Sequence, residues 1–274
     1  MRSFWRLIGM LTGTCLLSTL AATTATADPV TDALEATDLS PDELMAAFDD
    51  AILTGLQPMI GPAPSITGNA DLDNRIRELA EARGYERRAE PSIPLTRIDG
   101  RFLQPQAAAA WEELRTAATN AGHSITLTSA YRSARHQAWI FRSRLAGTSD
   151  AALGTLLETA AAPGYSKHHT GYAIDLRSGN SVLFDFATTP AYAWLSANNF
   201  ANAKAHGWMP SYPFGIDDQG PNPEPWEFVW AGAVNIICAD FAPSEGNPFC
   251  DTLDSIFVDD VTWLHQTKIT TGCT

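Results

Sequence analysis

The segment from Ser166 to Asp175, which reads SKHHTGYAID, constrains the fold of this chain more than any other stretch. Its end predicts a short strand over residues 173–176, and its beginning predicts a loop. Gly171 permits a sharp turn between them, which would bring the side chains of His168 and Asp175 to one point. An imidazole and a carboxylate are both zinc ligands. A histidine and an aspartate at this spacing also fit an ordinary hydrogen-bonded pair.

A second group of polar residues lies where a strand passes into a helix. Residues 124–128 alternate as a strand does, and Ser133 can cap a helix that runs to about Arg144. Arg132, at the start of this helix, can hold a carboxylate with two parallel hydrogen bonds. Gln137 lies about one turn further, near the same point. The same spacing also fits a surface arginine in a salt bridge.

A third group is the run PEPWE, which begins at Pro223 and precedes a short predicted strand over residues 227–230. Its two acids, Glu224 and Glu227, are three residues apart and can reach a common site. They also fit a loop with solvated carboxylates.

Around these segments, periodic apolar residues predict helices at about residues 70–83 and 106–121, each followed by a glycine. Thr189-Pro190 and Gly207 mark the start and the end of a third helix at about residues 190–206. Helices and short strands that mix without regular alternation favour an α+β fold.

The chain has 274 residues, which we divide into four parts. Residues 1–27 have the basic start, apolar middle and small final residues of a signal peptide, and the apolar stretch is shorter than the ~20 residues that span a bilayer. Residues 28–68 form a helical segment and linker, and residues 69–235 the main domain. Residues 236–274 are a cysteine-bearing tail. We therefore expect an exported protein, periplasmic or associated with the cell wall, without a membrane span after cleavage.

The net charge is −13 and becomes −15 once Arg2 and Arg6 leave with the signal peptide. A protein this acidic is a poor partner for nucleic acid or for anionic lipid. Cys15 leaves with the signal peptide, so three cysteines remain. Outside the cytoplasm, three cysteines favour one disulfide and one leftover thiol. Cys238–Cys250 and Cys250–Cys273 are both open as that pair.

Together and in this order, the three groups resemble the VanY-type D-alanyl-D-alanine carboxypeptidases. This family belongs to the LAS metallopeptidases and resembles the hedgehog signalling domain in fold. The resemblance covers roughly residues 95–232 and follows the family's three motifs, S-x-x-R-S-x-x-x-Q, S-x-H-x-x-G-x-A-x-D and E-P-W-H. They are carried here by Ser129, Arg132, Ser133 and Gln137, by Ser166, His168, Gly171, Ala173 and Asp175, and by Glu224, Pro225 and Trp226. A Tyr-Pro pair before the last motif, at Tyr212, also matches.

The resemblance implies a small antiparallel sheet with surrounding helices and a site that holds Zn²⁺. By it, His168 and Asp175 are metal ligands, and Glu224 is the general base. Arg132 binds and polarises the substrate, and Ser129, Gln137 and Ser166 line the peptide site. The implied partner is the peptidoglycan stem peptide; the oligomeric state is not implied.

One position departs from the family: Glu227 stands where the third zinc-ligand histidine is expected. Glutamate also binds zinc, although a second anionic ligand weakens the metal's Lewis acidity and can favour a harder ion. His169 and His206 are alternative ligands, and a site without metal is a further alternative.

Two functions follow. The first is an exported metal-dependent peptidase acting on stem peptide, with D-alanyl-D-alanine carboxypeptidase as the expected activity. The second is a pseudopeptidase that binds wall peptide without cutting it, because residue 227 is not histidine.

Overall fold

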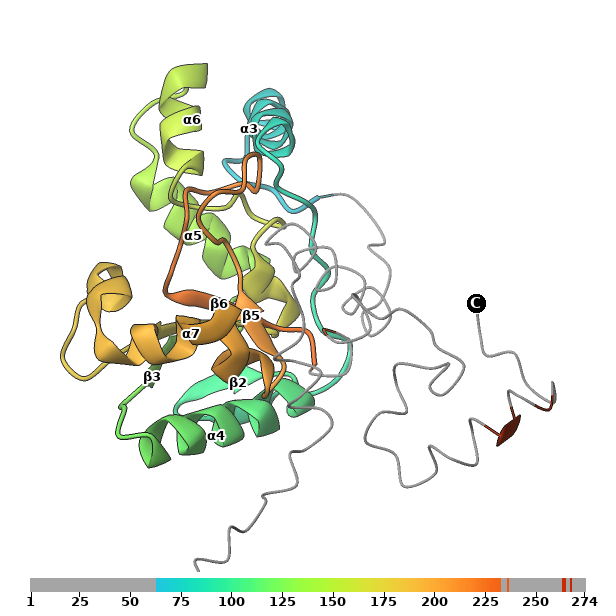
Figure 1. The fold of residues 1–274 in the computed structure, drawn as a ribbon. Coiled ribbons are helices and arrows are strands. Elements are labelled where there is room, and N and C mark those ends of the chain that lie inside the picture. Colours follow the sequence, from blue (N-terminus) through green and yellow to red (C-terminus); the bar gives the residue numbers. More distant parts are fainter. Residues whose placement is uncertain (1–62, 233–235, 237–262, 265–266, 268–274) are drawn as a thin grey trace, which may run out of the picture.

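The computed structural model describes residues 63–232, 236, 263–264 and 267, and Figure 1 shows their arrangement. The predicted signal peptide, most of the segment before residue 69 and all three tail cysteines lie outside these residues. Within the part that is described, no helix has both the length and the apolar character needed to cross a membrane.

A four-stranded antiparallel sheet lies at the centre of the fold (Figure 1). Its strands, in spatial order, are β3 (Thr126–Ser129), β4 (Ala173–Arg177), β6 (Glu227–Trp230) and β5 (Trp208–Pro210). The structure therefore confirms the α+β prediction with a small antiparallel sheet. The strands over residues 173–176 and 227–230 lie where they were expected, whereas β3 begins two residues later than predicted.

The hairpin of β1 (Thr96–Ile98) and β2 (Arg101–Leu103) was not predicted. It turns at Asp99 and Gly100, which have φ of 48° and 76°. Positive φ at both central residues is typical of the tightest hairpin turns, and Asp-Gly is a strong sequence signal for them. The signal was therefore present in the chain.

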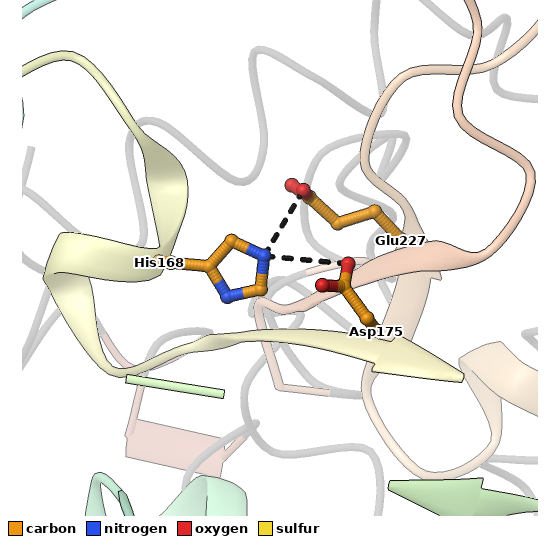
Figure 2. A group of neighbouring side chains, drawn as sticks. All are labelled: His168, Asp175 and Glu227. Atoms are coloured by element: carbon orange, nitrogen blue, oxygen red, sulfur yellow. Dashed lines mark ion pairs between the residues drawn. The ribbon is translucent and has the colours of Figure 1, made fainter. Parts of the chain in front are cut away.

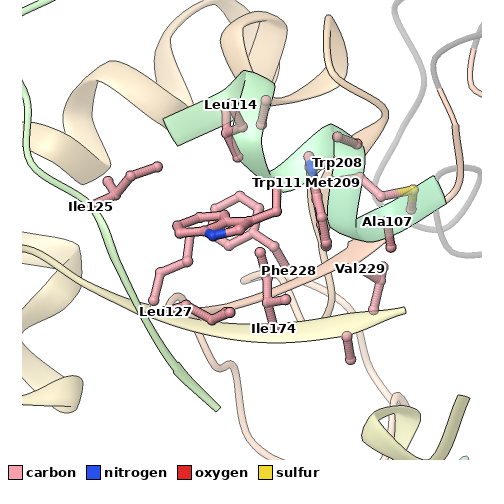
Figure 3. Packing of buried hydrophobic residues seen from close by; sticks show 14 of the residues in the cluster. Ala107, Trp111, Leu114, Ile125, Leu127, Ile174, Trp208, Met209, Phe228 and Val229 are labelled. Carbon is pink, nitrogen blue, oxygen red and sulfur yellow. The ribbon is translucent and has the colours of Figure 1, made fainter. Parts of the chain in front are cut away.

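One face of the sheet packs against α4 (Pro105–Asn120), as Figures 1 and 3 show. Trp111 of α4 is completely buried over Ile174 and Phe228, which are paired in register on β4 and β6. Neighbouring residues of a strand point to opposite faces. The next pair along, Asp175 and Glu227, therefore faces away from this core.

The other side of the sheet carries α3 (Ala70–Ala82), α5 (Ala134–Arg144) and α6 (Asp150–Leu157) (Figure 1). These helices share a second apolar core, to which Ile76 and Phe141 contribute fully buried side chains. Ser133 caps α5 by accepting a hydrogen bond from the backbone N–H of His136, as predicted. The α6 helix was not predicted.

Three further segments complete the described fold. α7 (Pro190–Lys204) begins at its cap Thr189, and an irregular stretch at residues 197–200 interrupts it. Two 3₁₀ helices, η1 (Lys167–Thr170) and η2 (Leu183–Thr188), flank β4. The residues around His168 are thus a short helix rather than the loop expected from the sequence. The helices predicted near residues 70–83 and 106–121 are confirmed as α3 and α4.

Candidate active site

Three side chains from separate elements meet on the face of the sheet opposite α4. The Nε2 atom of His168 lies 3.3 Å from Oδ1 of Asp175 and 3.2 Å from Oε2 of Glu227 (Figure 2). All three side chains are buried, and one ligand atom from each lies within 4.8 Å of the others. The structure therefore brings together the histidine and the two acids that the sequence singled out.

The turn after η1 sets the position of His168. Gly171 ends η1 with φ of 75°, and its carbonyl accepts a hydrogen bond of 3.0 Å from the backbone N–H of Gln104. A Cβ atom at this glycine would lie 3.2 Å from Leu95 and 3.3 Å from the Gln104 side chain. Glycine is therefore required here both by backbone conformation and by space.

A hydrogen bond from Nδ1, on the side of the ring away from the carboxylates, fixes the orientation of the His168 ring. Its Nδ1 atom lies 2.7 Å from the carbonyl oxygen of Ala130, so Nδ1 carries the proton and donates it. The lone pair of Nε2 then faces the two carboxylates. Among the described residues, Nε2 and Oδ1 of Asp175 have no hydrogen-bond partner. Buried polar atoms without partners, converging from three ligand side chains, fit a bound cation.

The charges around His168 demand a positive charge between the carboxylates. Burial opposes a charged imidazole, but Asp175 and Glu227 outweigh burial and raise the pKa of His168 to about 10. Burial likewise opposes a charged Glu227, yet His168 and the hydroxyl of Ser211 lower its pKa to about 2. Ser211 Oγ donates a hydrogen bond of 2.6 Å to Oε1 of Glu227. A proton or a metal cation can supply the positive charge that this site favours.

Glu224 lies beside this cluster at the start of a turn. Its backbone N–H donates to Tyr212, and its carbonyl accepts from the N–H of Glu227, both at 2.9 Å. Burial and the nearby charges of Glu227 and Asp175 raise the pKa of the Glu224 carboxyl well above its usual range. A carboxyl with a raised pKa next to a candidate metal site has the properties of a proton-transfer group.

A small cavity of about 50 Å³ opens beside these residues. Arg132, Gln137 and Ser166 line it together with Glu224 and Glu227. Arg132 is held by its backbone N–H, which donates to the His168 carbonyl at 3.1 Å, and its guanidinium lies 3.4 Å from the Ser166 hydroxyl. Arg132 and Glu224 thus line the same cavity.

The remaining predicted peptide-binding positions differ in their placement. Gln137 is buried in the wall of the cavity and donates from Nε2 to the Ala161 carbonyl at 2.6 Å. Ser129 ends β3 opposite Asp175 and does not line the cavity. The sequence pattern placed Ser129 in the right region, but its side chain is one strand removed from this space.

The two alternative histidine ligands lie elsewhere. His169 is buried beside His168, with Nδ1 2.6 Å from the Arg132 carbonyl and Nε2 accepting a hydrogen bond from Gly164 at 3.0 Å. His206 contacts Glu113 of α4 at 3.7 Å. Neither joins the His168 cluster, and η1 rather than an extended strand directs His169 away from it. Glu227 is therefore the residue that stands in the third position.

Sequence reasoning missed two contributors. Ser211 orients Glu227, and only the following Tyr-Pro pair was noticed in the sequence. Tyr85, which lines the cavity from the end of α3, donates from its hydroxyl to Leu157 at 2.6 Å. No local pattern distinguishes Tyr85 from an ordinary core tyrosine, because its place depends on how α3 packs.

An α+β domain with a histidine between two carboxylates, beside an arginine and a glutamate, fits a peptidase. Residues 100–233 match the family model described as VanY: D-alanyl-D-alanine carboxypeptidase. This match confirms the resemblance to that family which the sequence motifs indicate.

The individual relatives share less than 30% sequence identity with this chain. YodJ of Bacillus subtilis (strain 168), named as a putative carboxypeptidase, is 29% identical over 140 residues, which are 50% of this chain and 49% of YodJ. The chain thus spans about half the length of this curated relative. Two solved structures are also similar. The LdcB LD-carboxypeptidase is 26% identical with a TM-score of 0.44, covering 55% of this chain and 69% of LdcB. VanYB in complex with D-alanine-D-alanine is 24% identical with a TM-score of 0.45, and the match covers 54% of this chain and 83% of VanYB.

Proposed function

We propose that this protein is an exported, metal-dependent peptidase that removes the terminal D-alanine from peptidoglycan stem peptides. The observation that carries the proposal is the convergence of His168, Asp175 and Glu227. One ligand atom from each lies within 4.8 Å of the others, and Arg132 lines the adjacent cavity. The family match of residues 100–233 supports the carboxypeptidase reaction. The signal-peptide pattern of residues 1–27 supports export from the cytoplasm. Peptidoglycan stem peptides are found outside the cytoplasm, so export would bring the protein to such a substrate.

His168, Asp175 and Glu227 are the residues that would hold zinc. When bound, zinc supplies a Lewis acid that polarises the scissile carbonyl and lowers the pKa of a water toward ~7. Two carboxylates and one neutral imidazole, oriented by the Ala130 carbonyl and the Ser211 hydroxyl, form a suitable set of donors.

The other residues act on the substrate and its protons. Arg132 binds the negatively charged end of the peptide, and Ser166 supports the guanidinium from its side. Gln137 lies in the wall of the same cavity. Glu224 accepts a proton from the attacking water and returns it to the amine that leaves when the peptide bond breaks. The developing charge on the carbonyl oxygen is stabilised by the cationic Arg132.

The test is release of D-alanine from a peptide that ends in D-Ala-D-Ala, using the mature protein loaded with zinc. We expect turnover that stops after exhaustive chelation and returns with zinc. Glu224→Gln should keep the zinc and lose at least ~100-fold in kcat, because proton transfer contributes about 10²–10⁴-fold. Activity that survives complete metal removal would overturn the metal-dependent mechanism.

The second candidate is a protein that binds wall peptide without cutting it, and the observation that favours it is Glu227. A second anionic ligand weakens the Lewis acidity of the bound metal relative to a site with two imidazoles and one carboxylate. Glu227→His separates the two functions. A large gain in turnover from an inactive native protein would favour the binder, whereas a native protein with stoichiometric zinc and turnover favours the enzyme.

A further inference from the structure

A second cavity, of about 190 Å³, adjoins the candidate active site. Tyr85 and Tyr212 line both cavities and so form the wall between them. Part of the second cavity comes from residues 84–88, which precede the residues that match the VanY family model. The family's motifs therefore do not account for this space.

The inner wall of the second cavity carries two cationic side chains. Lys167 is only 3% exposed, donates from Nζ to the Ser211 carbonyl at 2.8 Å, and lies 4.1 Å from the centre of the Tyr212 ring. The side chain of Arg88 is 10% exposed, and its backbone N–H donates to Gly164 at 2.8 Å. A buried ammonium fixed in this way, beside a largely buried guanidinium, forms a favourable place for a carboxylate.

The rim of the same cavity is acidic. Asp217 and Asp218 are exposed on the loop before β6, and Glu86 lies 3.4 Å from Arg88 with a largely exposed side chain. This loop is packed against the end of α3 so closely that a Cβ at Gly84 would overlap the Asp218 carbonyl. The Gly220 N–H also donates a hydrogen bond of 2.7 Å to the Arg83 carbonyl, which joins the loop to the end of α3. The acids therefore stay beside the cations.

We propose that the second cavity is a subsite for a wall-peptide side chain that ends in an α-amino acid group, as that of diaminopimelate does. Its carboxylate lies toward Lys167 and Arg88, and its ammonium lies toward Asp217 and Asp218. A side chain that ends in an amine alone, such as that of lysine, matches only the rim. The proposal rests on the proposed function, because it assumes that the peptide runs on from the Arg132 cavity past Tyr212.

The experiment compares two pentapeptides that end in D-Ala-D-Ala and differ only at the third residue, which is meso-diaminopimelate or lysine. A charge-assisted hydrogen bond contributes about 1.5–3 kcal/mol, so the zinc-loaded protein should prefer the diaminopimelate peptide by ~10-fold or more in kcat/KM. Arg88→Leu should reduce this preference to less than ~3-fold, mainly through KM. Arg97→Leu, the same change at an exposed position of β1, should leave the preference intact.

Equal kcat/KM for the two peptides, or an equal loss on both with Arg88→Leu, would overturn the subsite while leaving the proposed function in place. If neither peptide is cleaved, the proposed function fails, and the subsite is tested by binding alone. Calorimetry then compares the tripeptide L-Ala-γ-D-Glu-meso-diaminopimelate with its lysine counterpart. Tighter binding of the former, lost in Arg88→Leu, supports the subsite, and equal binding refutes it.

Discussion

Asp175 on β4 and Glu227 on β6 are direct partners in the antiparallel register of the central sheet. Directly opposite residues have Cβ atoms about 4.5–5.5 Å apart, so their carboxylates share one face and one small space. Like charges at such positions destabilise a sheet unless a positive charge lies between them. The pairing of these two strands therefore places two carboxylates beside His168, in a group that could hold a cation, on the sheet face opposite α4.

The first prediction concerns metal affinity. Glu227→Gln keeps the shape of the side chain but removes one anionic donor, so the affinity for zinc should fall at least ~10–100-fold. Competition with a chromophoric chelator measures this change. Glu112→Gln, on the exposed face of α4, is the matched control and should bind zinc as the native protein does. Unchanged affinity in Glu227→Gln would mean that Glu227 is not a ligand.

A second prediction concerns His169 as a positioning residue for Arg132. Its neutral imidazole links the Arg132 carbonyl to the Gly164 N–H, and burial lowers the pKa of His169 to about 4. His169→Ala should release the backbone of Arg132 and raise KM more than it lowers kcat. The discrimination between a peptide with a free carboxylate and its C-terminal amide should also shrink, because Arg132 recognises that charge.

His169→Asn supplies the control, since an amide also offers one donor and one acceptor. It should recover part of the discrimination that alanine loses. A general loss of stability would instead lower activity equally on the free and the amidated peptide, and that result would refute the positioning role. Zinc content should stay unchanged in both variants.

The elements that carry the site could be predicted because their signals are local. Alternation over residues 124–128 located β3, the end of the SKHHTGYAID segment located β4, and the residues after Glu224 located β6. The turn of η1 was mistaken for a loop because a single 3₁₀ turn has no apolar period of its own. Tyr85 could not be predicted, since α3 and the loop before β6 meet only in the folded chain. The domain boundaries and the roles assigned to the site residues remain predictions.

A third prediction follows from the turn after His168. Gly171→Ala places a Cβ 3.2 Å from Leu95 at a position with φ of 75°, so we expect a loss of about 1–3 kcal/mol in the free energy of unfolding. Chemical denaturation measures the loss. Gly154→Ala, inside α6 with open space around it, is the same substitution in a helix and should stabilise by about 0.5–1 kcal/mol. A loss at both positions would contradict the conformational argument.

A fourth prediction concerns the dependence of stability on pH at the start of α3. Burial opposes the charge of Asp73, but hydrogen bonds from Thr67, Ile66 and Ser65 outweigh it and lower the pKa of Asp73 to about 2. In the unfolded chain the same carboxyl takes up its proton near 3.8. The folded state therefore holds fewer protons between these values. The stabilisation is complete above about pH 4–5 and is lost as the pH falls toward 2.

Asp73→Asn should therefore lower the free energy of unfolding by about 1–2 kcal/mol at pH 7, and the difference from the native protein should narrow between pH 4 and pH 2. Asp71→Asn, an exposed acid in the same first turn of α3, is the control and should change stability by less than ~0.5 kcal/mol at either pH. Denaturation midpoints across this range decide the matter. A deficit in Asp73→Asn that stays constant down to pH 2 would show that shape rather than charge makes Asp73 important.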